Sequence, residues 1–128
     1  MTFHAEGRFT TSGDASLLGS AVENVVRNGV RYTPEGSTVE VRIASASRDT
    51  QQFAEVTVRD HGPGVPAVRL RDIFRPFYRV DDARERQTGG AGLGLAMTER
   101  AVTAHGGSVE AENTGAGLLV RLLIPATR

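Results

Sequence analysis

Several common features are missing from this chain of 128 residues, and each absence narrows its possible roles. There is no cysteine, which excludes disulfides and thiolate metal sites and fits a reducing compartment. Neither charge is in excess, because 15 basic residues balance 15 acidic ones, so nothing favours binding to nucleic acid or to a membrane surface. No apolar run approaches the ~18 residues of a transmembrane helix, and no signal-peptide pattern opens the chain.

The length fits one domain over residues 1–128, large enough to bury a hydrophobic core. The sequence contains no internal repeat and no low-complexity segment. We therefore expect a soluble domain, and any membrane segments of a parent protein would lie outside this chain.

Glycine is concentrated in one short run, at Gly89, Gly90, Gly92 and Gly94. Glycine buries no side chain and loses more backbone entropy on folding than any other residue, so such a run costs stability. It is useful where bare N–H groups must come close to a ligand, and a helix beginning at residue 95 would add an N-terminus that favours phosphate. The alternative is a flexible linker, but the regular placement of Leu93 and Leu95 argues against it.

Apolar periodicity and turn residues define the expected secondary structure. Helical patterns cover residues 15–32, with Asp14 as N-cap and Pro34 just beyond the end, and residues 95–105. Strands are predicted over 7–11, 37–46, 53–60, 108–112 and 118–124, and a short helix over 67–74. This order predicts an α+β fold, a two-layer α/β sandwich with a mixed, mostly antiparallel sheet and about three helices on one face.

Polar residues interrupt two of these patterns. Asn24 and Asn28 lie four residues apart on one face of the predicted helix, although asparagine is unfavourable inside a helix. Their amide oxygens suit Mg²⁺ beside substrate phosphates. Asp60 falls on the core face of its strand, where a carboxylate needs a donor. The alternatives are two partly exposed asparagines without a ligand, and an aspartate that caps the turn containing Gly62 and Gly64 rather than accepting a ligand amine.

The segment 80–90 is charged and has little apolar content, so it can bury little. It separates an aromatic cluster at 74–79 from the glycine run. A mobile loop in that position is expected to act as a lid, and the alternative is a plain solvated surface loop.

Four motifs follow one another along the chain: Asn24-x-x-x-Asn28, Asp60-x-Gly62-x-Gly64, Phe74-x-x-Phe77 and Gly90-x-Gly92-x-Gly94. In order and spacing they resemble the N, G1, F and G2 boxes of the catalytic, ATP-binding domain of two-component sensor histidine kinases. That domain has the Bergerat ATP-binding fold and shares a superfamily with the DNA gyrase B subunit, the ninety-kilodalton heat-shock chaperone and the MutL repair protein. The resemblance covers residues 13–124, and segments 23–28 and 74–79 look most like the Cpx-type envelope-stress sensor kinases.

The resemblance implies a role for each motif residue. Asn28 would ligate Mg²⁺ through its amide oxygen, with Asn24 supporting the metal and phosphate side of the catalytic site. Asp60 would accept a hydrogen bond from the exocyclic amine of adenine, and Arg79 would offset charge at the γ-phosphate in the transition state. Further nucleotide-binding residues would be Arg31 at the phosphates, Tyr32 near adenine, Gly62 and Gly64 along the nucleotide, Phe74 and Phe77 as anchors of the lid, and Gly90, Gly92, Leu93 and Gly94 around the phosphates.

The resemblance also implies an enzyme that uses ATP and Mg²⁺. It would transfer the γ-phosphoryl group to a histidine on a separate dimerisation domain of the same kinase, with a response regulator as an indirect partner. Positioning and charge neutralisation are the main requirements of this transfer, so a metal, an arginine and backbone donors suffice. The isolated domain would be monomeric and cytoplasmic, without direct membrane contact, in a parent protein of the bacterial inner membrane.

Two departures from the family pattern keep other hypotheses open. Gly29 stands where the family usually has alanine, a change that costs ~1 kcal/mol inside a helix. No dimerisation segment is found in this chain, and we interpret His4, His61 and His105 as bystanders. The alternatives are a stand-alone protein-serine kinase of the anti-sigma-factor type and a non-catalytic nucleotide-sensing module. The segment 74–79 and the long charged lid favour the histidine kinase.

Overall fold

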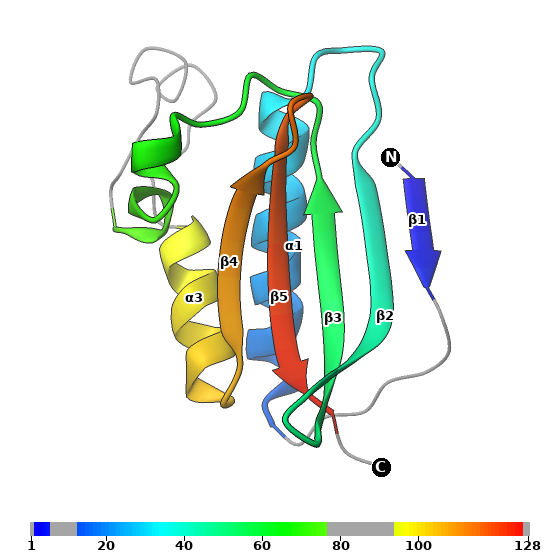
Figure 1. Ribbon diagram of the computed structural model, residues 1–128, viewed down its shortest axis with the longest axis vertical. Coiled ribbons are helices and arrows are strands. Elements are labelled where there is room, and N and C mark those ends of the chain that lie inside the picture. Colours follow the sequence, from blue (N-terminus) through cyan, green and yellow to red (C-terminus); the bar gives the residue numbers. More distant parts are fainter. Residues whose placement is uncertain (1, 6–12, 77–93, 127–128) are drawn as a thin grey trace.

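The computed structural model describes residues 2–5, 13–76 and 94–126, and the statements below concern those residues. The elements in chain order are β1 (Thr2–Ala5), α1 (Ala15–Tyr32), β2 (Glu40–Arg48), β3 (Gln51–Arg59), the 3₁₀ turns η1 (Ala67–Arg69) and η2 (Asp72–Phe74), α3 (Gly94–Ala104), β4 (Ser108–Asn113) and β5 (Leu118–Pro125). Figure 1 shows two layers, a sheet in front and the helices behind it. None of the helices described is long and apolar enough to cross a membrane.

Over the described residues the sheet has five strands in the order β1-β2-β3-β5-β4. β1 runs parallel to β2, and the other neighbouring pairs are antiparallel. Both α-helices lie on one face, α1 behind the centre of the sheet and α3 next to α1 at the β4 edge (Figure 1). The predicted α+β two-layer sandwich with a mixed, mostly antiparallel sheet is therefore confirmed. In the described residues its helical layer consists of α1, α3 and the turns η1 and η2.

The core lies between the sheet and the two α-helices. α1 contributes buried Leu18, Ala21 and Val25 at the three- and four-residue spacing of a helical stripe. The strands contribute alternate residues, which are Val41, Val56, Val58, Val120 and Leu122 among others. Because side chains alternate along a strand, Asp60 falls on the same face as the buried valines of β3, and it is only 4% exposed.

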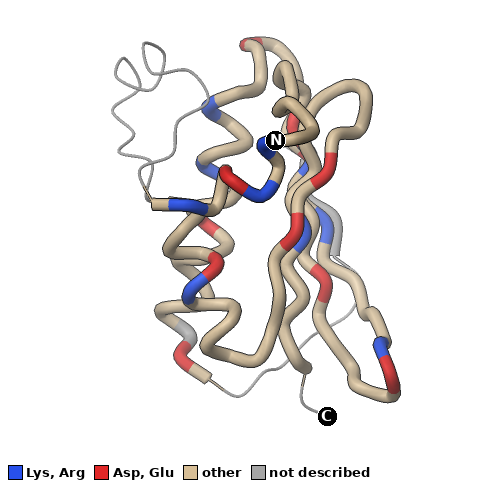
Figure 2. Tube along the Cα trace, turned by 60° about the vertical axis from the view of Figure 1, so that its left-hand side comes forward, with Lys and Arg blue, Asp and Glu red and all other residues tan. Residues whose placement is uncertain are grey.

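The opposite face of the sheet carries ion pairs centred on Arg121 of β5. Its guanidinium lies 3.4 Å from Glu55 of β3 and 3.2 Å from both Glu110 and Glu112 of β4. Desolvation, the largest influence, lowers the pKa of Arg121, but the hydrogen bonds to Glu110 and Glu112 and the charges of Glu110 and Glu55 together raise it above its ordinary value. Arg121 therefore stays charged and links three strands, and Figure 2 shows both signs of charge interspersed along the sheet.

α1 begins and ends at the predicted signals, an N-cap residue at its start and a proline just beyond its end. The side chain of Asp14 accepts a hydrogen bond from the N–H of Leu17 at 3.1 Å, as an N-cap should. At the other end the N–H of Thr33 donates to the carbonyl of Gly29 before Pro34 begins the loop. α1 is therefore fixed by local chemistry as well as by its buried stripe.

His105 joins the end of α3 to the start of α1, a structural role that sequence analysis missed. Its Nδ1 lies 2.7 Å from the carbonyl oxygen of Ala101, and its Nε2 accepts a hydrogen bond from the N–H of Asp14 at 3.0 Å. Because a carbonyl only accepts and a backbone N–H only donates, the ring proton belongs on Nδ1. A Cβ at Gly13 would lie 2.1 Å from the ring, so a glycine there permits the contact.

Some boundaries differ from the predictions. The strand predicted over 7–11 lies outside the described residues, and the edge of the sheet beside β2 is formed by β1. β2 begins at residue 40 rather than 37, because a turn in which Ser37 N–H donates to Pro34 O, with Gly36 at φ 89°, occupies the preceding residues. The short helix predicted over 67–74 is two separate 3₁₀ turns.

Two glycine positions differ in whether they have room for the methyl group of an alanine. In α1, a Cβ at Gly19 would meet no atom within 4 Å, whereas at Gly107 it would lie 2.1 Å from the carbonyl oxygen of Leu123. We expect Gly19→Ala to raise the free energy of unfolding by about 1 kcal/mol through helix propensity. Gly107→Ala should lower it by about 1–3 kcal/mol, because the backbone of β5 must move. Urea denaturation of both variants checks this, and equal effects would contradict the packing described.

Candidate functional site

α1 supplies one row of polar side chains to the candidate site. Asn24, Asn28 and Arg31 follow each other at four- and three-residue spacing and are half-buried, and Tyr32 follows at the end of the helix. Hydrogen bonds within the described part of the chain do not engage the amide groups of Asn24 or Asn28. Two half-buried amides therefore remain available to a ligand on this side of the helix.

The N-terminus of α3 lies against this row. A Cβ at Gly94, the first residue of α3, would lie 3.7 Å from the Cβ of Asn24 and 3.9 Å from its Oδ1. Deeper in the pair, the hydroxyl of the fully buried Thr98 donates to the carbonyl of Ala21 at 2.9 Å. The N–H groups of the first turn of α3 are therefore fixed beside Asn24, in the position that favours an anion.

Asp60 closes the site from the sheet side, at the end of β3. Its Oδ1 accepts hydrogen bonds from the N–H of Gly62 at 3.0 Å and of Leu118 at 2.9 Å. No hydrogen bond among the described residues uses its Oδ2. A carboxylate has about four lone-pair sites, so capping the turn leaves capacity for a ligand donor. The two interpretations of Asp60 from sequence are therefore compatible, one oxygen for each.

The loop after Asp60 packs tightly, which gives its glycines a steric reason of their own. A Cβ at Gly62 would lie 2.6 Å from the carbonyl oxygen of Tyr32. Gly64 has φ 76°, a conformation that favours glycine, and a Cβ there would lie 2.8 Å from Oδ1 of Asn113. His61 fixes the same loop, because its N–H donates to Oγ1 of Thr33 at 3.1 Å. This loop is thus held against the end of α1.

Gly29 connects α1 to Asp60. A Cβ at this buried position would lie 3.3 Å from Cγ1 of both Val39 and Val58 and 3.8 Å from the Cβ of Asp60. The helix turn that carries Asn28 therefore rests directly on the end of β3. Residues far apart in sequence, near 24–32, 60–64 and 94, meet at one end of the fold.

Of the two predicted anchors of the lid, Phe74 and Phe77, only Phe74 lies among the described residues. Phe74 is 7% exposed in η2 and belongs to the hydrophobic core, as an anchor should. The other predictions in this part of the chain, which are Phe77, Arg79, Gly90, Gly92, Leu93 and the lid over 80–90, lie outside the described residues.

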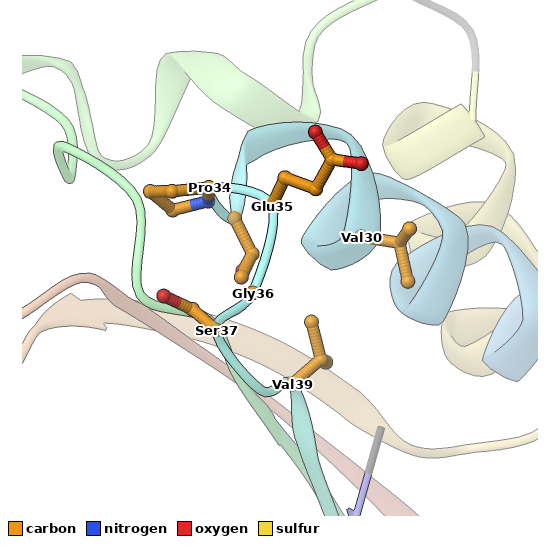
Figure 3. A pocket seen from close by; sticks show the side chains of 7 residues that line it. Val30, Pro34, Glu35, Gly36, Ser37 and Val39 are labelled. Carbon is orange, nitrogen blue, oxygen red and sulfur yellow. The ribbon is translucent and has the colours of Figure 1, made fainter.

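A separate pocket of about 330 Å³ lies where α1 passes into β2. Figure 3 shows Val30 and Val39 on its sides and the loop of Pro34 to Ser37 around it. The residues predicted for the site do not line this pocket. It therefore contributes nothing to the arrangement around Asp60.

Residues 13–128 match the model of the family described as histidine kinase-, DNA gyrase B- and HSP90-like ATPase. The chain belongs to this ATPase family. It is thus an ATP-binding domain, and the fold and superfamily implied by the four motifs are confirmed.

Within this family, the chain is similar to sensor histidine kinases. The chain is 45% identical to sensor histidine kinase CpxA of Escherichia coli (strain K12) over 118 residues, which is 92% of this chain and 24% of the relative. It is 34% identical to sensor histidine kinase WalK of Bacillus subtilis over 113 residues, 88% of this chain and 18% of the relative. The chain therefore spans about a quarter or less of the length of these curated relatives.

Solved structures agree with this assignment. The mycobacterial sensor histidine kinase MprB superposes with a TM-score of 0.79 at 30% identity, covering 98% of this chain and 83% of that one. Full-length ShkA in complex with AMPPNP gives a TM-score of 0.73 at 27% identity, covering 98% of this chain and 25% of that one. The resemblance to the catalytic domains of sensor histidine kinases is therefore confirmed.

The hydrogen bond from Thr98 tests how α3 is held on α1. Thr98→Val keeps the β-branched shape and removes the buried hydroxyl, so it should lower the free energy of unfolding by about 1 kcal/mol. Thr103→Val, on the exposed side of the same helix, is the matched control and should change it by less than about 0.5 kcal/mol. Urea denaturation gives both numbers, and equal losses would mean that the bond to Ala21 contributes nothing.

Proposed function

We propose that this chain is the catalytic domain of a sensor histidine kinase, which binds Mg-ATP and donates the γ-phosphoryl group to a histidine on a separate dimerisation domain. One observation carries the proposal: the buried carboxylate of Asp60 commits Oδ1 to two backbone N–H groups and keeps Oδ2 for a ligand, and it lies against Gly29 of the helix that carries the uncommitted amides of Asn24 and Asn28. Oδ2 of Asp60 suits a hydrogen-bond donor on the base, and the amides of Asn24 and Asn28 suit a metal ion at the phosphates.

Adenine would be recognised at the Asp60 end of the site. The exocyclic amine of adenine is a hydrogen-bond donor, and Oδ2 of Asp60 accepts it. Guanine carries a carbonyl oxygen at the equivalent position, which would face the carboxylate without a donor. Tyr32, whose carbonyl lies beside Gly62, borders the same end.

Phosphates and metal would be held at the other end. The amide oxygen of Asn28 is a neutral, hard ligand of the kind Mg²⁺ accepts beside phosphate oxygens, and Asn24 supports it next to Gly94. Bound Mg²⁺ would supply charge neutralisation across the phosphates. Arg31 follows on the same face of α1, and Arg79 and the glycine run complete the phosphate side in our proposal.

The relatives support the reaction class. Proteins similar over nearly the whole of this chain carry the names of sensor histidine kinases, and one similar structure, ShkA, is in complex with the ATP analogue AMPPNP. On the same basis we propose a dimerisation domain of the same kinase as direct partner, a response regulator as indirect partner, and a parent protein of the inner membrane. The serine-kinase and non-catalytic hypotheses gain no support from these names.

Adenine selectivity is the first test. Asp60→Asn keeps an oxygen for the N–H groups of Gly62 and Leu118 but places an amide donor in front of the adenine amine. We expect calorimetry to show Mg-ATP binding weakened about a hundredfold, or ~3 kcal/mol, while Mg-GTP stays weak with both proteins.

Glu55→Gln is the matched control for Asp60→Asn, because it makes the same change from carboxylate to amide on the opposite face of β3, the strand that Asp60 follows. It should leave ATP affinity unchanged. If the unaltered domain binds ATP and GTP equally, or does not bind ATP, the proposed function is wrong.

Metal dependence is the second test. Asn28→Ala removes the proposed ligand, so the gain in ATP affinity that Mg²⁺ provides should fall by about tenfold or more. ATP affinity measured with EDTA should not change. Ser20→Ala, exposed on the same helix, serves as the control. An Asn28→Ala variant that keeps its full response to Mg²⁺ would show that the metal is held elsewhere.

A further inference from the structure

The turn between β4 and β5 contacts the loop of the proposed site in ways that the proposed function does not use. Besides donating to Oδ1 of Asp60, Leu118 accepts a hydrogen bond from the N–H of Asp60 at 2.9 Å. A Cβ at Gly117 would lie 2.1 Å from the carbonyl oxygen of Asp60. The turn therefore packs on Asp60 as closely as backbone allows.

Asn113, the last residue of β4, holds the far end of the same loop. Its Oδ1 accepts a hydrogen bond from the N–H of Val65 at 3.0 Å, and its Nδ2 donates to the carbonyl oxygen of Val65 at 2.6 Å. One side chain thus satisfies both backbone polar groups of Val65, as a neighbouring strand would. Val65 itself is only 9% exposed, in the core.

These contacts fix both ends of the segment 60–65 to one turn. Leu118 fixes Asp60, and Asn113 fixes Val65, while Gly62 and Gly64 lie between them. The segment belongs to no helix or strand, so side-chain and turn contacts must take the place of a backbone ladder. Loss of the two hydrogen bonds between Asn113 and Val65 would free the part of the loop that follows Gly62.

We propose that Asn113 is a positioning residue for the nucleotide base, which fixes the loop 61–65 so that Asp60 and the loop backbone meet adenine in one geometry. This inference rests on the proposed function. Asn113 does not touch the nucleotide; it acts through Val65 and Gly64. Affinity for ATP, and the preference for ATP over GTP, therefore depend on a side chain in the β4–β5 turn.

Asn113→Ala removes both bonds to Val65 at an exposed residue, where truncation leaves no cavity in the core. We expect the Kd for Mg-ATP to rise about tenfold, the weak affinity for Mg-GTP to change little, and the ATP:GTP affinity ratio to fall about tenfold. Calorimetry with both nucleotides measures this ratio, and urea denaturation shows the fraction folded.

Thr114→Ala is the matched control from the same turn. Among the residues that the structure describes, its hydroxyl bonds only to the carbonyl of Gly117 and the N–H of Ala116, so the loss stays within the turn. ATP affinity should be retained within about twofold, and any loss of stability reports the structural contribution of the turn alone.

Asn113→Asp is a second variant of nearly the same size. It keeps an acceptor for the N–H of Val65 but sets an oxygen against the carbonyl of Val65 in place of the donor. Weaker ATP binding by this variant is expected, since the bond at 2.6 Å is replaced by repulsion.

The outcomes separate this inference from the proposed function. If Asp60→Asn loses ATP binding but both Asn113 variants keep the original Kd and selectivity, the proposed function stands and the role of Asn113 is wrong. Equal losses for ATP and GTP, or a change confined to unfolding, would also overturn it. A domain that does not bind ATP at all would overturn both proposals.

Discussion

A carboxylate that is 4% exposed must find hydrogen-bond donors, and Asp60 finds them in the N–H groups of Gly62 and Leu118. This need ties together a strand end, the loop that follows it and the first residue of β5. Because the Asp60 side chain also lies against Gly29, α1 is included in the same arrangement. The site is therefore built where four segments converge on one buried acid.

The helices complete the site because they are held to each other as well as to the sheet. The hydroxyl of Thr98 donates to the carbonyl of Ala21 in the middle of the α1–α3 interface. At the other end of this interface, His105 accepts a hydrogen bond from the N–H of Asp14, the N-cap of α1. These polar contacts define how α3 sits along α1, which a purely apolar interface would leave less specific. They place Gly94, at the N-terminus of α3, beside Asn24, so the proposed phosphate and metal groups lie on one side of the site.

Much of this arrangement follows from sequence periodicity. The stripe of α1 and the alternation of β3 predict the two layers and place Asp60 on the core face, and local caps predict where α1 begins and ends. The roles of Thr98, His105 and Asn113 do not follow, because each depends on a backbone group 48 to 91 residues away. A polar residue at the end of a strand, as at Asn113, is a common turn signal, and only the tertiary contact gives it a function.

Gly29 shows how a locally unfavourable residue can serve the site. A glycine inside a helix costs about 1 kcal/mol relative to alanine. Here a methyl group would lie 3.3 Å from Cγ1 of both Val39 and Val58, tighter than ordinary contact, so either these side chains or α1 would have to shift by a few tenths of an ångström. Since Asn28 and Asp60 lie on either side of this contact, the spacing between the proposed metal ligand and the proposed base acceptor depends on it. The departure from the family's usual alanine is thus a matter of how closely α1 approaches β3.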